Sequence, residues 1–227
     1  MSEDFYFAQL SKIDFQVILK EALDENDYHI PTPYELHKLE SLYWDSTNLS
    51  KFITNTFTDP NFLIHFNIQN LSAKFDALNT FLSLLINDIN KTCIPRIIAL
   101  SETLLTEHNK HCFPIINYHP IVCKNRPDNS ARGGVAIYIR DDCEFDERPD
   151  LNVFIPQVFE SVFVTLHHLD ITIGVIYRSP LADTSAFLRY FNDVINSLKK
   201  SNSKFILLGD FNIDLLKYKQ ILTSPNL

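Results

Sequence analysis

The stretch 204–217, KFILLGDFNIDLLK, joins an apolar strand pattern to an abruptly polar end. Four consecutive apolar residues, Phe205 to Leu208, are typical of a buried strand. Gly209, Asp210 and Asn212 follow directly after them. Because ligands of open α/β folds bind beyond the ends of strands, this pattern predicts that Asp210 and Asn212 stand at a functional edge. Gly209 would let the backbone turn there without a side chain in the way.

Upstream of this strand, strand patterns alternate with helix patterns, which predicts a mixed α/β fold. Strands are predicted at 62–66, 96–100, 120–123, 133–140, 159–166 and 171–177, and helices at 72–89 and about 187–200. The first two strands flank a helix, so we expect them to pair in parallel. The strands at 159–166 and 171–177 are predicted to form a hairpin that turns at 167–170.

Residues 1–60 are predicted to form a helical extension and linker ahead of a domain that spans 61–227. One helical pattern runs from about Ala8 to Leu23. A second helix is predicted to start at Thr32 to Glu35, a capping box with proline at the first helical position. Its apolar stripe consists of Leu36, Leu39 and either Leu42 or Tyr43.

Composition excludes several classes of function. The chain has only four glycines among 227 residues, which leaves no room for the glycine-rich motifs of dinucleotide or P-loop sites. No apolar run approaches the roughly 18 residues that cross a bilayer, and the acidic N-terminus lacks a signal-peptide pattern, so we expect no membrane and an intracellular location. The net charge of −8 counts against tight, non-specific nucleic-acid binding by the whole chain. It is compatible with a local phosphate site where metal ions supply the positive charge.

The four cysteines are predicted to be free thiols, since none forms a C-x-x-C pair and an intracellular chain keeps thiols reduced. They are Cys93, Cys112, Cys123 and Cys143. The sequence HNKHC places His108, His111 and Cys112 at metal-like spacing. Its polar setting and the lack of a second cysteine pair favour a surface loop over a zinc site.

Polar side chains follow four of the predicted strands. They are Asn67 after 62–66, Glu102 after 96–100, Tyr177 and Arg178 after ITIGVI, and Asp210 with Asn212 after the opening strand. Each has a structural alternative, such as a strand cap, a solvated acid, a half-buried tyrosine or an Asx-turn. Strand ends converge in space, so the set together predicts one site.

The chemistry of this set is coherent. Mg²⁺ takes oxygen ligands, often one or two carboxylates plus waters, and Glu102 can supply one. An aspartate held by hydrogen bonds can orient and deprotonate a water molecule. Asparagine and tyrosine can hold the non-bridging oxygens of a phosphate. These are the parts needed for metal-assisted phosphodiester hydrolysis.

The segments FNIQNLSAKFDAL, IIALSETLL, GGVAIYIRDD, GVIYRSP and LLGDFNIDLL resemble, in order and spacing, the endonuclease/exonuclease/phosphatase superfamily. Within it they are most similar to the AP-like endonuclease domain of non-LTR (LINE-type) retrotransposons, over about 62–218. The resemblance implies a DNase-I-like, four-layer α/β/β/α sandwich. It also implies an enzyme that uses Mg²⁺, with Mn²⁺ as an alternative, to nick DNA in the nucleus for a fused or associated reverse transcriptase.

The resemblance also implies roles for individual residues. Glu102 would bind Mg²⁺ with Asn67 close to the metal, Asp210 would activate the attacking water, Asn212 and Tyr177 would bind the scissile phosphate, and Arg178 would contact the phosphate backbone.

Two features depart from the family pattern. Leu104 stands where the family usually has tryptophan, and none of the eight histidines follows Asp210, so the family's downstream Ser-Asp-His segment is missing. We therefore expect a sandwich that is incomplete at its C-terminus, with weak or no nicking activity. Two alternatives stay open: a phosphoinositide-type phosphatase of the same superfamily, and a catalytically inactive fragment that serves as an interaction module.

Overall fold

The computed structural model of the chain describes residues 5–8, 41–44, 62–88, 94–124, 133–201 and 204–212. Contacts divide the chain into two compact units, residues 1–56 with 214–227, and residues 57–213. In the first unit, β1 (Phe5–Ala8) pairs antiparallel with β2 (Ser41–Trp44). All residues predicted for the site belong to the second unit.

The strand β2 corrects one sequence prediction. Either Leu42 or Tyr43 was expected to complete the apolar stripe of a helix, but the structure places both in β2, paired with Phe7 and Tyr6. Aromatic residues favour strands, and pairing between distant segments overrides a short helical period. The predicted helix from about 8 to 23, the start of the second helix at 32–35 and the linker at 46–60 lie outside the described residues, apart from Ala8, which ends β1. The functional division at residue 60 stays a prediction.

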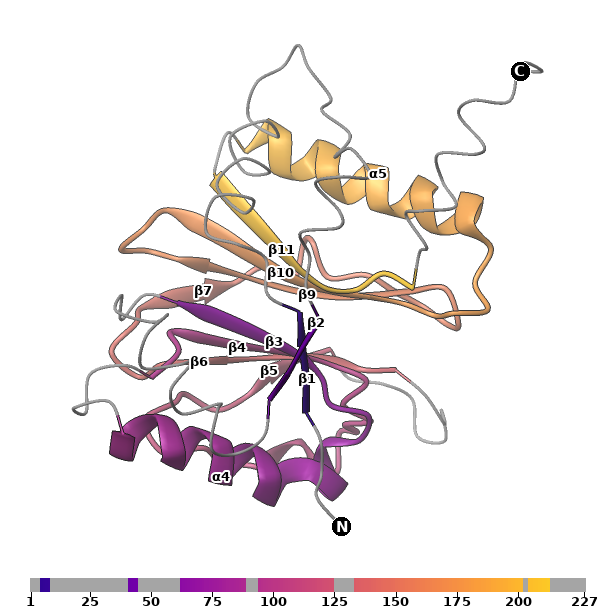
Figure 1. Ribbon diagram of the computed structural model, residues 1–227. Coiled ribbons are helices and arrows are strands. Elements are labelled where there is room, and N and C mark those ends of the chain that lie inside the picture. The colour runs from indigo at the N-terminus through magenta and orange to yellow at the C-terminus, as the bar shows by residue number, and fades with distance from the viewer. Residues whose placement is uncertain are drawn as a thin grey trace. The chain divides into compact units, whose positions relative to one another are not determined.

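The described residues of the second unit form two sheets and two long helices (Figure 1). The four-stranded sheet has the order β3 (Leu63–Asn67), β4 (Ile97–Ser101), β6 (Val135–Ile139) and β5 (Val122–Cys123). The five-stranded sheet has the order β11 (Lys204–Asp210), β10 (Ile171–Arg178), β9 (Phe159–Leu166) and β7 (Phe145–Glu147), with β8 (Phe154–Ile155) also paired to β9. The helices are α4 (Leu71–Asp88), α5 (Thr184–Lys200) and the short 3-10 helix η1 (Lys110–Cys112).

The two sheets pack face to face around one apolar core. Residues from β4 and β6, such as Ile97 and Ile137, share this core with Val164 of β9 and Val175 of β10. Helix α4 covers the outer face of the four-stranded sheet, and α5 covers the outer face of the five-stranded sheet (Figure 1). The layers are therefore helix, sheet, sheet, helix, and the predicted four-layer fold class is confirmed.

Sequence alternation sets which face each strand residue occupies, because successive side chains of a strand point to opposite sides. In β9 and β10 one set of residues faces the inter-sheet core, and the other set packs against α5. The second set includes Phe163 and Ile176, which meet Phe187 and Val194 of the helix. The Asp183 carboxylate caps α5 by accepting a hydrogen bond from the Ala186 amide at 2.7 Å.

Most predicted elements appear within one or two residues of their expected bounds. β3 pairs with β4 in parallel, and β9 pairs with β10 as an antiparallel hairpin, both as predicted. The predicted helix at 72–89 starts one residue earlier, at Leu71, and the side chain of the preceding Asn70 accepts a hydrogen bond from the Ala73 amide at 3.3 Å. The predicted last residue of that helix, Ile89, lies outside the described residues, and β7 and β8 were not predicted.

The described cysteines and the HNKHC segment lie at different depths in the domain. Cys112, Cys123 and Cys143 are free thiols, while Cys93 lies outside the described residues. His111 and Cys112 are exposed in η1. Within the described ranges no group of three or more His, Cys, Asp or Glu side chains is placed to hold a metal ion. In the same ranges, no helix is long and apolar enough to cross a membrane.

Replacing Gly174 by alanine should destabilise the domain. Gly174 pairs with Phe163 across the hairpin, and a Cβ at this position would overlap with the fully buried Phe163 ring. We expect Gly174→Ala to lower the free energy of unfolding by about 1–3 kcal/mol, measured by urea denaturation. Asn196→Ala, on the exposed face of α5, is the control and should stay within about 0.5 kcal/mol of the parent chain. An equal effect of the two changes would contradict this packing.

Candidate active site

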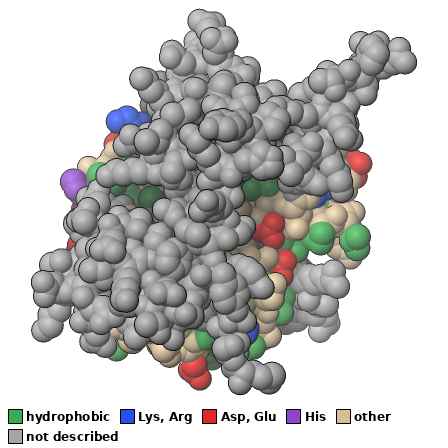
Figure 2. Space-filling model, viewed as in Figure 1, with side chains coloured by type: hydrophobic (Ala, Val, Ile, Leu, Met, Phe, Trp, Pro, Cys, Tyr) green, Lys and Arg blue, Asp and Glu red, His purple; other side chains and the backbone are tan. Residues whose placement is uncertain are grey.

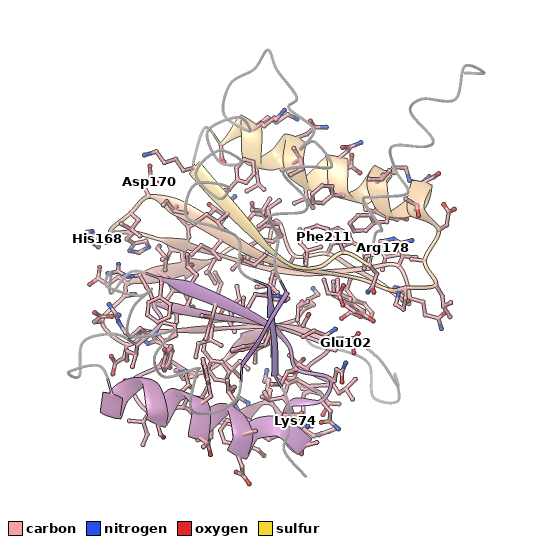
Figure 3. The ribbon with its side chains drawn as sticks, viewed as in Figure 1. Lys74, Glu102, His168, Asp170, Arg178 and Phe211 are labelled. Carbon is pink, nitrogen blue, oxygen red and sulfur yellow. The ribbon has the colours of Figure 1, made fainter. Side chains whose placement is uncertain are left out.

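The two sheets are joined at one edge by a hydrogen bond between strand ends. The Asn67 side-chain amide, at the end of β3, donates to the Asp210 carboxylate, at the end of β11, at 2.8 Å. The two residues are 143 positions apart in the chain. Figure 3 shows Glu102 and Arg178 at this same edge, whereas His168 and Asp170 lie at the opposite edge. The structure thus brings the predicted strand ends together.

The Asp210 carboxylate is held at both oxygens. Oδ2 accepts from Asn67, and Oδ1 accepts from the backbone amide of Asn212 at 3.1 Å. Glycine is required just before Asp210. The φ of Gly209 is +146°, and a Cβ at this position would overlap with the backbone carbonyl of Ile176 in the neighbouring strand. The carboxylate is only partly buried, so it keeps contact with solvent while its orientation is fixed.

Tyr177 lies beside Asp210 in the second sheet and reaches toward the first. It pairs with Asp210 in the parallel register of β10 and β11. Its hydroxyl is hydrogen-bonded to the Glu102 side chain. Burial, followed by the negative charges of Glu102, Asp210 and Glu160, raises the pKa of Tyr177 to about 12. Tyr177 is therefore a neutral phenol at physiological pH and can donate a hydrogen bond.

Glu102 sits in a backbone conformation that is uncommon for a residue with a side chain. Its φ is +55°, and Leu104, two residues on, has φ +53°. Backbone hydrogen bonds hold this loop: Glu102 O accepts from the Asn70 amide at 2.8 Å, and the Leu104 amide donates to Gly133 O at 3.0 Å. Left-handed conformations of this kind cost free energy and persist where surrounding contacts impose them. Asn212, at the end of β11, has φ +48° as well.

The structure places Arg178 on the outer face of its sheet. Tyr177 faces the inter-sheet core, so its neighbour Arg178 points to the opposite face, where its guanidinium lies 5.9 Å from the centre of the Phe187 ring. Arg178 is 5% exposed and donates to Asn212 O at 2.8 Å, to Ala182 O at 2.5 Å and to Thr184 Oγ1 at 2.9 Å. This buried arginine anchors the strand ends, and its predicted contact with a phosphate backbone stays a prediction.

Asn212 is coupled to Arg178 in both directions. The Asn212 side-chain amide donates to Arg178 O at 2.7 Å, while the Arg178 guanidinium donates to Asn212 O. The Asn212 side chain is exposed, but its amide is already engaged within the domain. Its predicted contact with a scissile phosphate stays a prediction.

A histidine that sequence analysis did not select lies beneath the site. His65 lies in β3, and its Nε2 is hydrogen-bonded to the hydroxyl of the fully buried Ser101 at 3.2 Å. Burial lowers the pKa of His65 from 6.5 to about 4, and the nearby charge of Asp210 only partly offsets this shift. His65 is therefore neutral near pH 7. The sequence could have indicated His65, because it lies two residues before Asn67 and therefore on the same face of the strand.

Glu160 is a second residue that sequence analysis missed. It is 3% exposed in β9, pairs with Tyr177 across the hairpin, and accepts from the Gly134 amide at 2.8 Å. The signal was available, because counting back from the predicted turn at 167–170 places Glu160 opposite Tyr177. Glu160 lies on the same, core-facing side of its strand as Val162 and Val164, because residues two apart share a face.

The charges around Tyr177 are suited to a cation. The groups that shift its pKa are three carboxylates, and none is a lysine or arginine. Figure 2 shows acidic side chains reaching the surface at this edge. Since the described His, Cys, Asp and Glu side chains do not form a ligand set alone, a cation here would also use amide oxygens and waters, as Mg²⁺ does. Glu102 and the Asn67 amide oxygen are the donors that fit.

Comparison with protein families decides the family of the chain. The model described as the endonuclease/exonuclease/phosphatase family matches residues 64–218, which include the whole edge described above. The chain belongs to the endonuclease/exonuclease/phosphatase family. Among curated protein sequences no match is found.

Several solved structures of the endonuclease/exonuclease/phosphatase type are similar to this chain at low identity. The endonuclease domain of TRAS1, a telomere-specific non-LTR retrotransposon, is 15% identical with a TM-score of 0.46, and the match covers 67% of this chain and 60% of that domain. D. rerio TDP2 complexed with a single-strand DNA product is 14% identical with a TM-score of 0.46, over 72% of this chain and 65% of that one. A mannosyl-6-phosphatase of Bacteroides thetaiotaomicron is 15% identical with a TM-score of 0.44, over 67% and 65%.

Replacing Arg178 by lysine should test its structural role. A lysine cannot reproduce the three hydrogen bonds of the planar guanidinium, so Arg178→Lys should lower the free energy of unfolding by about 2–4 kcal/mol. Urea denaturation measures this, with Arg189→Lys on the exposed face of α5 as control. A stable Arg178→Lys chain that binds DNA more weakly would instead restore the phosphate-contact role.

The neutral His65 should make the metal-free domain acid-sensitive. Its pKa is about 4 in the folded chain and about 6.5 when unfolded, so the unfolded state binds more protons between these values. Stability should then fall as the pH is lowered from 6.5 to 4, by up to about 3 kcal/mol. In urea denaturation across this pH range, the free energy of unfolding should fall less steeply in His65→Gln than in the parent chain. The exposed His168→Gln should follow the parent chain, and parallel curves for His65→Gln and the parent chain would refute this account.

Proposed function

We propose that this edge is the active site of a divalent-metal-dependent phosphodiesterase that nicks DNA, of the type found in non-LTR retrotransposons. The observation that carries the proposal is the hydrogen bond between Asn67 and Asp210. It supports a single site because it brings a metal-compatible amide and a candidate base together from two different sheets. Family membership supports hydrolysis of phosphate esters as the chemistry.

Metal binding is assigned to Glu102 and the Asn67 amide oxygen, completed by waters. When bound, Mg²⁺ would supply the positive charge that a phosphate needs among these carboxylates. Glu102 suits this role because backbone hydrogen bonds fix its position and its side chain is only partly buried. The Asn67 amide nitrogen donates to Asp210, which leaves its oxygen as the atom available to a cation.

Asp210 is assigned the role of general base. Both of its oxygens accept hydrogen bonds, so the carboxylate is oriented before a substrate arrives. A carboxylate held in this way can position a water molecule and accept its proton as the water attacks phosphorus. Tyr177, a neutral phenol that is 2% exposed, would exchange its present hydrogen bond to Glu102 for one to a non-bridging phosphate oxygen. Asn212 would add a second donor after rearrangement of its present bond to Arg178.

DNA is the proposed substrate because the sequence motifs resemble those of retrotransposon endonucleases. On this proposal the chain works with a fused or associated reverse transcriptase, in the nucleus. The site chemistry itself does not distinguish DNA from other phosphodiesters or phosphate monoesters. A direct comparison of substrates is therefore part of the test.

Nicking of supercoiled plasmid with Mg²⁺ tests the assignment of Asp210. The assay should use the enzyme in large excess over DNA, so that a single nick per plasmid is detected. Asp210→Asn keeps the shape of the side chain but removes the base, and it should lower the rate by about 100-fold or more. Asp193→Asn, on the exposed side of α5, is the matched control and should nick like the parent chain. Equal rates for the parent chain and Asp210→Asn would contradict the role of Asp210.

A substrate comparison separates the alternatives. Release of inorganic phosphate from a phosphoinositide, with no nicking of plasmid, would favour the phosphatase alternative. No hydrolysis of either substrate, in a chain that melts cooperatively, would favour the inactive interaction module.

A further inference from the structure

Glu160 is a buried acid that the proposed chemistry does not use. It is 3% exposed, and it accepts a hydrogen bond from a backbone amide inside the domain. An acid at this depth is costly unless hydrogen bonds compensate it. One such bond crosses between the sheets, from the Gly134 amide, just before β6, to Glu160 Oε2 in β9, at 2.8 Å.

Gly134, which is held by Glu160, is in turn hydrogen-bonded to the loop that carries Glu102. Gly134 O accepts from the Thr103 amide at 3.2 Å, and the neighbouring Gly133 O accepts from the Leu104 amide at 3.0 Å. Thr103 and Leu104 directly follow Glu102, and the left-handed conformations of Glu102 and Leu104 need contacts that impose them. The glycine pair supplies those contacts, and Glu160 holds the glycine pair.

A second connection runs through Tyr177. Glu160 pairs with Tyr177 across the β9–β10 hairpin, and the Tyr177 hydroxyl is hydrogen-bonded to Glu102. Glu160 therefore acts on Glu102 from two directions, through the backbone at Gly134 and beside the phenol. Both routes link the second sheet to a loop of the first.

We propose that Glu160 is a positioning residue that fixes the Glu102 loop, through Gly134, in the geometry that binds the metal. The part concerning the loop stands on the hydrogen bonds alone, while the part concerning metal rests on the proposed function. Groups that orient metal ligands without touching the metal typically change metal affinity by 10–100-fold when removed.

Amide hydrogen exchange in the full chain tests the effect on the loop. The chain has only four glycines, so selective ¹⁵N-glycine labelling isolates the Gly134 signal, and ¹⁵N labelling of threonine and leucine adds the loop. In Glu160→Ala the exchange of Gly134, Thr103 and Leu104 should rise by about tenfold or more. In Glu160→Gln a carbonyl oxygen can still accept from Gly134, so exchange should return to within about threefold of the parent chain.

Thr172→Val is the matched control for stability. Thr172 is fully buried at the other end of β10 and shares a 3.0 Å hydrogen bond with Thr165. Its replacement removes one buried hydrogen bond in the same sheet, away from the site. Exchange of Gly134, Thr103 and Leu104 should change by less than about twofold in this variant, after correction for global stability.

Calorimetric titration with Mg²⁺ alone tests the link to the metal. The dissociation constant should rise by about 10–100-fold in Glu160→Ala, by less in Glu160→Gln, and by less than about twofold in Thr172→Val. Unchanged exchange at Gly134 and the Glu102 loop in Glu160→Ala would overturn the positioning role. If Glu160→Ala shows faster exchange but binds Mg²⁺ as tightly as Thr172→Val does, the link between Glu160 and the metal is overturned. Glu160 would then have a structural role only.

The same experiments separate this inference from the proposed function. If the parent chain binds no Mg²⁺, the metal-dependent function fails, and so does the metal part of the inference. The exchange of Thr103 and Leu104 then still decides whether Glu160 positions the Glu102 loop.

Discussion

Face-to-face packing of two sheets is the constraint on which the candidate site depends. Each strand contributes one row of side chains to the inter-sheet core, and that row continues to the strand end. In β10 the row runs through Ile173 and Val175 to Tyr177, and in β11 Leu208 leads to Asp210. The site is thus the place where the apolar rows become polar. Its groups are brought together by the same burial that stabilises the fold.

Polar groups at the end of a core must satisfy one another, and here they do so across the gap between the sheets. Asn67 bonds Asp210, Glu102 bonds Tyr177, and Gly134 bonds Glu160. Each of these links joins one sheet to the other. Hydrogen bonds in a partly buried setting fix side-chain orientation, which is a requirement for catalysis that relies on positioned groups.

The outer face of the second sheet supports this edge independently. Arg178 holds the loop after β10 and the residue after β11 through bonds to Ala182 and Asn212. The phenyl ring of Phe187 packs nearby and belongs to the apolar cluster between α5 and the sheet. One strand therefore presents a candidate phosphate-binding side chain, Tyr177, on its inner face and a structural anchor, Arg178, on its outer face, because neighbouring residues alternate.

The sequence by itself determined the elements and the candidates within them. Apolar periodicity located β3, β4, β9, β10, β11 and α5, and polar residues after strands identified Asn67, Glu102, Tyr177 and Asp210. The tertiary structure alone decided which strand ends meet, since the bond between Asn67 and Asp210 spans 143 residues and local periodicity holds no information on it. It also placed Arg178 on the outer face, put Leu42 and Tyr43 in the strand β2, and revealed the buried Glu160. The physical reason is that a residue's face and partners follow from register and sheet packing, which are long-range properties of the chain.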